Sequence, residues 1–329
     1  MAKFSYQHES ILLLLLLILS ATIGWFNPAF FGPGNLLSIL KSCAIPGILA
    51  LGTLLVLLSG NIDISFPAIA AASMYVTCKL ALSAPWLDQM TLLVLLSATI
   101  GCLLGLANGV LVHCFNLPAL IVTLGTGSLI RGGLLAFVGT RIVANLPSSM
   151  IAFSKATLFP IQDAGGQSTG LAISVVIYFV LALVTHLLLM RTMLGRGIYA
   201  LGGAPESARR IGFPILGIQF FIYSFVGLLA GIAGILHAST VRNANPFDLA
   251  GLELTVIAAV VLGGTSITGG RGSVLGVMLG VALLVVLGNS LILLGLPSHW
   301  HQVASGLALI LGTGLTAWRS RKGQSERGV

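Results

Sequence analysis

The sequence predicts an all-α protein, a polytopic transmembrane bundle of about ten spanning helices. Of its 329 residues, 57% are hydrophobic and only 7% are charged, whereas soluble globular domains carry about 25% charged residues. The 41 glycines follow no collagen period and lie inside apolar runs, as expected where membrane helices pack closely. A water-soluble enzyme is therefore excluded, and so is a disordered chain, because disorder needs low hydrophobicity and high charge.

A spanning helix needs roughly 20 mainly apolar residues. Ten segments fit and form one transmembrane domain over 1–329: 10–26, 36–58, 65–84, 91–112, 118–138, 171–190, 215–238, 252–268, 273–294 and 302–318. The first follows Lys3 as in a signal peptide, but it lacks an A-x-A cleavage pattern, so we expect a retained helix. The eighth is short and interrupted by glycine, which favours a broken or re-entrant element.

Basic residues outside these segments are unevenly distributed. With a cytoplasmic N-terminus, the cytoplasmic side receives Lys3, Arg191, Arg196, Arg209, Arg210, Arg271, Arg319, Arg321, Lys322 and Arg327. The opposite side receives only Arg141, Lys155 and Arg242. This asymmetry agrees with the positive-inside rule and predicts that both termini are cytoplasmic. The net charge of +8 therefore indicates loop orientation, and nucleic acid is not an expected partner.

Two connections are long enough to carry function. Residues 139–170 form a predicted extracytoplasmic loop, and residues 191–214 form a basic cytoplasmic loop. In the second, Pro205 to Arg210 predicts a short helix, with Glu206 near its positive N-terminus, arginines near its negative end and Gly212 after it. Such an exposed helix is well placed to dock on a cytoplasmic partner. The alternative is a solvated basic connection.

A polar joint lies between two apolar segments at residues 59–67. A charge near membrane depth is costly, so Asp63 should face a cavity or a partner. Two interpretations are open: Asn61, Asp63 and Ser65 line a gate of a solute path, or serine or aspartate caps the next helix in an interfacial turn. A second glycine-rich joint at 261–273 follows an apolar span in the same way, which hints at an internal repeat.

Glycines recur every four residues at 101, 105 and 109, at 272, 276 and 280, and at 227 and 231. These stripes favour close packing inside the bundle, with contact to a second chain as the alternative. The sequence has no phosphate loop, no H-E-x-x-H motif and no C-x-x-C pair. No catalytic residue, cofactor-binding residue or metal site is therefore expected, and the four cysteines are expected to be small buried hydrophobes.

Four ordered segments carry a family resemblance. Gly60–Ser65 matches G-x-I-D-[LIV]-S, and Val122–Thr126 with Arg131-Gly132 matches T-L-G-T…R-G. Gly195–Gly212 matches G-R-x-x-Y-A-x-G-G…A-x-x-x-G-[IF], and Val261–Ser273 matches V-x-G-G-T-S-x-x-G-G-x-G-S. Over about 36–318 the chain thus resembles the permease subunit of bacterial ABC importers for ribose, xylose, galactose, rhamnose and the furanosyl autoinducer. It departs from that family at Phe66-Pro67, where small residues are usual, and at Ala204, where asparagine is usual.

The resemblance implies an inner-membrane transport subunit that is not an enzyme. Two permease chains, identical or paralogous, would form the pore on cytoplasmic ABC ATPases, which would hold the ATP and magnesium. A periplasmic binding protein would deliver the sugar to loop 139–170 and to residues 239–251. The cytoplasmic loop would couple to the ATPase through Gly195, Arg196, Pro205, Glu206, Ser207, Ala208, Arg209 and Gly212.

A neutral polyol needs hydrogen-bonding groups and little charge along its path. The candidates are Asn61, Asp63, Ser65, Asn108, Thr123, Thr126 and Asn289, although each could instead satisfy a neighbouring helix. Three rival functions are open: an ABC permease for another solute such as a branched-chain amino acid, an ion-coupled secondary transporter, and a membrane subunit without transport. The secondary transporter predicts acidic relays inside spans, for which only Asp63 and Glu253 are available.

Overall fold

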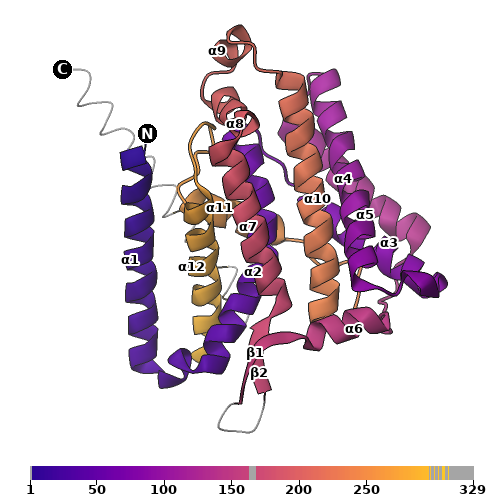
Figure 1. Cartoon of the computed structure of the whole chain (residues 1–329), viewed down its shortest axis with the longest axis vertical. Helices are drawn as coiled ribbons and strands as arrows, with labels where there is room; N and C mark the ends of the chain where they lie inside the picture. Colours follow the sequence, from indigo (N-terminus) through magenta and orange to yellow (C-terminus); the bar gives the residue numbers. More distant parts are fainter. Residues whose placement is uncertain are drawn as a thin grey trace.

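The computed structural model describes residues 2–162 and 168–295, together with positions 297, 300, 303, 306, 307 and 310. In this part of the chain the fold is an all-helical bundle with one small hairpin (Figure 1), which confirms the predicted fold class. The helices are α1 Ala2–Phe26, α2 Pro33–Leu58, α3 Phe66–Ser83, α4 Met90–Cys114, α5 Ala119–Gly133, α6 Ser148–Lys155, α7 Ile173–Arg191, α8 Met193–Gly203, α9 Pro205–Arg210, α10 Ile215–Val241, α11 Leu252–Leu262 and α12 Val274–Leu293.

Three shorter helical turns join them: η1 Pro28–Phe31, η2 Pro85–Leu87 and the π-helical η3 Leu134–Val138. Among the described residues, 8 helices are long and apolar enough to cross a membrane, and α11 is a shorter apolar one. The predicted span 252–268 corresponds to α11, which ends at Leu262 because Gly264 takes φ +87°. The predicted span 302–318 lies outside the described residues, apart from a few isolated positions.

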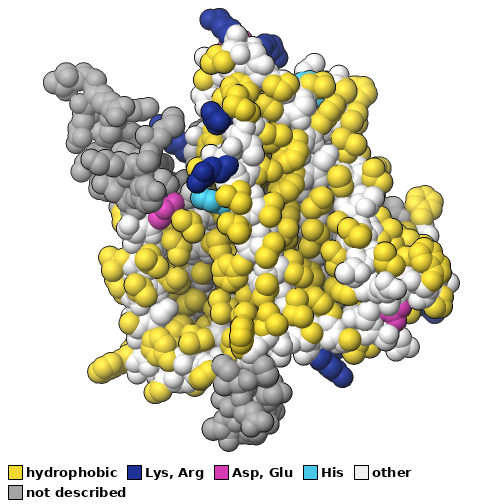
Figure 2. All heavy atoms as spheres, viewed as in Figure 1, with side chains coloured by type: hydrophobic (Ala, Val, Ile, Leu, Met, Phe, Trp, Pro, Cys, Tyr) yellow, Lys and Arg dark blue, Asp and Glu magenta, His cyan; other side chains and the backbone are white. Residues whose placement is uncertain are grey.

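Helix α2 forms the centre of the bundle. It is buried along most of its length and packs against α7, α10, α11 and α12. Helix α1 lies on the outside against α12, and most of its leucines are exposed. Figure 2 shows hydrophobic side chains over the flank and lysines and arginines mainly towards the end where α9 lies. An exposed apolar flank with charges towards one end is the surface expected of a bundle that sits in lipid.

The glycine stripes pack helix against helix inside the chain. A Cβ on Gly101 would lie 2.1 Å from the carbonyl oxygen of Gly227, and one on Gly105 would lie 2.2 Å from that of Tyr223. Ser97 Oγ donates to the carbonyl oxygen of Gly231 across the same seam between α4 and α10, at 2.7 Å. The stripe that contains Gly276 and Gly280 likewise packs, through these two residues, against the end of α11 within the same chain. The glycine faces therefore pack against other helices of the same chain, as the first of the two interpretations predicts.

The predicted extracytoplasmic loop contains more regular structure than expected. It forms α6 and an antiparallel hairpin of β1 Thr157–Gln162 and β2 Ser168–Ala172. Helix α6 is anchored by Asp88, which accepts hydrogen bonds from Ser148 N and Oγ (3.0 and 2.6 Å) and from Ser149 N (2.9 Å). These bonds, the Ser148 hydroxyl first, lower the pKa of Asp88 to about 2.

Among the described residues, basic side chains of the two predicted sets lie at opposite ends of the bundle, as Arg242, Arg209 and Arg210 show. Arg242 follows α10 and donates through Nε to Ser154 Oγ of α6, at 3.0 Å. Arg209 and Arg210 end α9, which precedes the start of α10. Helix α1 begins at the α9 end (Figure 1), where His8 Nε2 lies 3.0 Å from the carbonyl oxygen of Leu262.

Candidate functional site

The joint between α2 and α3 is shaped by a helix C-terminal cap. Gly60 takes φ +81°, and the N–H groups of Gly60 and Asn61 donate to carbonyl oxygens in the last turn of α2, at 2.9 and 3.2 Å. Gly264 and Thr265 make the equivalent two bonds to the end of α11, at 2.9 and 3.3 Å. This pattern is the Schellman cap, which a glycine at positive φ permits. The two glycine-rich joints therefore share one backbone geometry as well as a sequence resemblance.

Three glycine-rich segments meet at this end of the bundle. Gly270 N donates to the carbonyl oxygen of Leu58 at 2.9 Å, which joins the two caps. Gly202 of α8 fits between them, because a Cβ there would lie 1.8 Å from Leu58 O and 2.7 Å from Gly270 N. Tyr199 Oη donates to the carbonyl oxygen of Gly272 at 2.8 Å, and burial raises the pKa of Tyr199 to about 12. Helix α8 thus contacts both joints largely through backbone atoms.

The opposite face of the first joint carries a buried polar network, called here the joint cluster: Asp63, Ser65, Asn108 and Thr123. Asp63 Oδ1 accepts from Ser65 N and from Ser65 Oγ, both at 2.7 Å. Asn108 Nδ2 on α4 donates to Ser65 Oγ at 2.7 Å, and Ile64 N donates to Thr123 Oγ1 on α5 at 3.3 Å. The structure therefore brings four of the predicted path residues into one network.

The structure also bears on the capping interpretation of the joint. Ser65 is the N-cap of α3, but its side chain makes no capping bond. Asp63 instead binds the backbone only two residues ahead. Neither residue caps α3 through its side chain, so the bonds made by Asp63 and Ser65 serve the joint and its contact with α4.

The remaining path candidates lie apart from the joint cluster to different degrees. Asn61 is half-buried and lines a pocket on the α8 side of the joint. Thr126 lies one turn beyond Thr123 on α5. Asn289 lies near the other end of α12, where its Nδ2 donates to Asn35 Oδ1 at the start of α2, at 3.0 Å. Asn289 is thus not brought together with the others.

Helix α9 forms where the sequence predicts a short helix, and Gly212 ends the segment at φ +90°. Figure 1 shows α9 at the extreme end of the bundle, beyond α8. Ala208 is buried and anchors it, whereas four of its candidate neighbours are exposed: Pro205, Glu206, Ser207 and Arg209. The other two candidates lie in α8, with Gly195 buried and Arg196 exposed. Thr192 Oγ1 accepts from Gly195 N at 3.0 Å and so caps α8.

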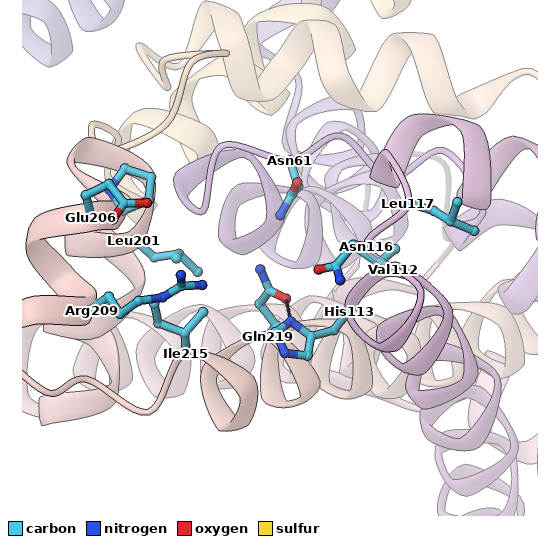
Figure 3. Close-up of a pocket in the computed structure, with 11 residues that line it drawn as sticks. Asn61, Val112, His113, Asn116, Leu117, Leu201, Glu206, Arg209, Ile215 and Gln219 are labelled. Atoms are coloured by element: carbon cyan, nitrogen blue, oxygen red, sulfur yellow. Dashed lines mark hydrogen bonds between the residues drawn. The ribbon is translucent and has the colours of Figure 1, made fainter.

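A polar pocket of about 280 Å³ separates α9 from the end of α4. In Figure 3 the guanidinium of Arg209 points into it, opposite His113 and Gln219. His113 Nδ1 and Gln219 Oε1 lie 2.6 Å apart and link α4 to α10. The pocket is lined by Asn61, Val112, His113, Asn116, Leu117, Leu201, Pro205, Glu206, Arg209, Ile215 and Gln219. It joins the predicted coupling residues to Asn61 of the joint.

Three polar residues that line the pocket, His113, Asn116 and Gln219, are absent from the sequence-based candidates, and so is Tyr223 on the α4-facing side of α10. Gln219 and Tyr223 are spaced i, i+4 on α10, so they share the face that packs on α4. Two polar side chains four residues apart in a largely apolar helix are the sequence signal that could have identified Gln219 and Tyr223. Tyr223 is buried, and its hydroxyl has no hydrogen-bond partner among the described residues. In the same part of the chain no group of three or more His, Cys, Asp or Glu could hold a metal ion.

Comparison with known proteins gives a consistent answer over nearly the whole chain. Residues 35–312 match the family described as branched-chain amino acid transport system / permease component. The chain is 34% identical over 317 residues to the autoinducer 2 import system permease protein LsrC of Yersinia enterocolitica, covering 94% of this chain and 84% of that protein. LsrC of Yersinia pestis strain Pestoides F is 34% identical over 311 residues, with 94% and 85% covered. No solved structure matches the chain.

Proposed function

Because the chain belongs to this family of ABC importer permease components, we propose that its cargo is a neutral monosaccharide or a related small polyol, of the ribose, xylose, rhamnose or furanosyl autoinducer class. As a multi-pass permease of the inner membrane, it is a transport subunit rather than an enzyme, and it works with ATPase and binding-protein partners. The cargo class goes beyond what the family settles, and it rests on the chemistry of the joint cluster.

The single observation that carries the proposal is the set of uncharged hydrogen-bonding side chains that the joint cluster places around the joint. Ser65, Asn108 and Thr123 offer hydroxyl and carboxamide groups, and no cationic side chain lies within 4.0 Å of Asp63 in the described part of the chain. A branched-chain amino acid would bring an ammonium and a carboxylate, each of which is costly to bury without an opposite charge. A polyol needs only donors and acceptors, which this cluster supplies.

A second permease chain, identical or paralogous, would complete the pore along α5. Support for this comes from the exposed face of α5, which carries Gly125, Ser128 and Gly132 between leucines. A Cβ on Gly125 or on Gly132 would meet nothing within 4 Å. Small and polar residues on a membrane helix favour contact with protein over contact with lipid. Thr123, on the buried side of the same helix, would then lie one helix away from the pore axis.

Coupling to the ATPase would run through α9 and α8. Glu206 and Arg209 are exposed on α9 and are our preferred contacts for the ATPase, which would hold the ATP and Mg²⁺. Closure of the ATPases would displace α9 and, through the backbone contacts of α8, both glycine-rich joints. That displacement would switch the cavity from outward-facing to inward-facing.

This arrangement makes the α9 end cytoplasmic, and with it the start of α1. The opposite end, with α6 and the connection after α10, would then meet the periplasmic binding protein through residues 139–170 and 239–251. The positive-inside asymmetry supports this orientation, because the sequence-based assignment gives that end three basic residues outside the spans, Arg141, Lys155 and Arg242, against ten for the other end. Cysteine-scanning accessibility at Arg141 and Arg210 tests the orientation directly.

The test of the cargo is reconstitution with the proteins encoded by the neighbouring genes. ATP hydrolysis in liposomes is measured with candidate sugars, with and without the binding protein. Stimulation that requires both a sugar and the binding protein would support the proposal and identify the cargo. Stimulation by leucine or isoleucine instead would establish the amino-acid alternative. ATP-independent uptake by this chain alone would overturn the assignment in favour of a secondary carrier.

A further inference from the structure

Two aspartates of this chain make opposite patterns of hydrogen bonds. At Asp88, both carboxylate oxygens accept: Oδ2 from Ser148 N and Oγ, and Oδ1 from Ser149 N. Three bonds accepted over both oxygens are the pattern expected of an ionised carboxylate, which has more acceptor capacity than a carboxylic acid. At Asp63, by contrast, both bonds from Ser65 go to Oδ1. Among the described residues, no donor reaches Asp63 Oδ2.

The surroundings of the two groups differ as well. Asp88 is half-buried in the connection before α4, whereas Asp63 is only 2% exposed. No lysine, arginine or histidine nitrogen lies within 4.0 Å of Asp63 in the part of the chain described. An isolated ionised carboxylate without a cation is among the most costly groups to bury, and such groups take up a proton instead.

The direction of each hydrogen bond in the cluster can be assigned. Ser65 Oγ accepts from Asn108 Nδ2, so its single hydrogen is free to go to Asp63 Oδ1. Oδ1 then accepts twice and behaves as the carbonyl oxygen of a carboxylic acid. Asn108 Oδ1, on the other side of the same cluster, is a buried acceptor with no donor among the described residues. The network therefore contains a free acceptor.

We propose that Asp63 is a neutral carboxylic acid in this conformation, with its proton on Oδ2, and that it positions the joint against α4 through Ser65. The proton makes Oδ2 a hydrogen-bond donor. As a positioning residue, Asp63 orients Ser65 Oγ, and Ser65 in turn binds Asn108. Neutral Asp63 also keeps a fixed negative charge out of a path built for uncharged solutes. This last point rests on the proposed function; the protonation state does not.

Asparagine is the matched replacement, because its carboxamide has one acceptor oxygen and a donor in the place of the acid hydroxyl. Leucine has nearly the same shape and neither group. If Asp63 is neutral, Asp63→Asn should support ATP-dependent uptake at least about tenfold faster than Asp63→Leu, since a lost buried hydrogen bond of this kind costs about a factor of ten or more. Asp88→Asn is the comparison at an ionised site, where an amide cannot accept on both sides and should not substitute.

The protonation state of Asp63 is measured without any solute by infrared spectroscopy, from the difference between the spectra of labelled and unlabelled protein. The protein is reconstituted with its partner chains at neutral pH, and aspartate is labelled with carbon-13. A protonated carboxyl gives a carbonyl stretch above the amide and carboxylate bands, and the label should shift it. We expect that band in the wild-type protein and in Asp88→Asn, and its loss in Asp63→Asn.

Absence of the labelled band in the wild-type protein would overturn the proposal, since Asp63 would then be ionised. Equal failure of Asp63→Asn and Asp63→Leu, with normal membrane insertion of both, would overturn the positioning role. A wild-type complex that transports no tested sugar but shows the band would refute the cargo class and leave Asp63 neutral. The two proposals thus fail separately.

Discussion

The substitution Gly227→Ala should destabilise the bundle, because it would force α4 and α10 apart. A Cβ at this position would lie 2.1 Å from the carbonyl oxygen of Gly101 and 2.9 Å from the Cα of Gly105. Such contacts are not seen below 3.0 Å, so the two helices must separate by the difference, 0.9 Å. Backbone atoms lie on both sides of the contact, so no side-chain rotation can relieve it.

The cost has two parts. Overpacking that shifts a helix backbone typically costs about 1–3 kcal/mol. Separation of the seam also weakens the hydrogen bond from Ser97 Oγ to Gly231 O, now 2.7 Å, which contributes about 0.5–1.5 kcal/mol. We therefore expect the free energy of unfolding of Gly227→Ala to fall by about 2–4 kcal/mol.

The same helix offers a matched control. A Cβ on Gly217 would meet nothing closer than Pro214 Cβ at 4.0 Å, so Gly217→Ala should leave stability unchanged or raise it by up to about 1 kcal/mol through helix propensity. Both variants are unfolded in mixed micelles of increasing dodecyl sulfate content, with loss of helicity as the readout. Equal midpoints for Gly217→Ala and Gly227→Ala would refute the close glycine seam and the reasoning built on it.

Three further predictions concern the two ends of the bundle. Glu206→Arg and Arg209→Glu should each reduce stimulation of the ATPase by loaded binding protein at least about fivefold, a coupling loss of about 1 kcal/mol; normal stimulation would remove both from the ATPase contact. Gly202→Ala should abolish uptake, because its Cβ would lie 1.8 Å from a carbonyl oxygen, whereas Gly203→Ala, with its nearest contact at 3.8 Å, should not. Because the pKa of Asp88 falls from 3.8 to about 2 on folding, its anchoring of α6 should be complete above about pH 4 and lost as pH falls through about 2. Unfolding midpoints measured between these values should show that loss, and Asp88→Asn should remove it.

Apolar length and proline and glycine punctuation predict the spanning helices well. The predicted span 36–58 and helix α2 end at the same residue, because Gly60 imposes a positive φ after it. The helical character of α8 is not predictable in this way. Its glycines, including Gly195 and Gly202, disfavour a helix, but the Thr192 cap and burial of Ile198 override that preference.

Residue type alone does not show which polar side chains meet. Asn108 and Asn289 are equal candidates by type, and each lies in an apolar helix. Asn108 binds Ser65, 43 residues earlier, whereas Asn289 binds Asn35 near the other end of the bundle. Such pairings are set by the packing of α3 against α4 and of α2 against α12, which a single sequence does not encode in any local pattern.

The joint between α2 and α3 is held by unlike contacts on its two faces. Towards α8 the contact is backbone against backbone at Gly202, which cannot yield locally. Towards α4 and α5 it includes three hydrogen bonds: Asn108 to Ser65, Ile64 to Thr123, and a long one of 3.5 Å from Thr123 to the carbonyl oxygen of Ile62. Each is worth about 0.5–1.5 kcal/mol net, so breaking all three costs about 1.5–4.5 kcal/mol.

That cost is smaller than the roughly 5.5 kcal/mol needed to reverse a two-state equilibrium from 1:99 to 99:1. A displacement driven by the ATPase at α9 should therefore carry the joint along with α8 and separate it from α4 and α5. Spin labels on α8 and on the joint should keep their distance through the ATP cycle, while the distance from the joint to α5 changes. If instead the distance from the joint to α5 stays constant while the distance from α8 to the joint changes, the joint moves relative to α8 and stays with α5. That result would contradict the prediction.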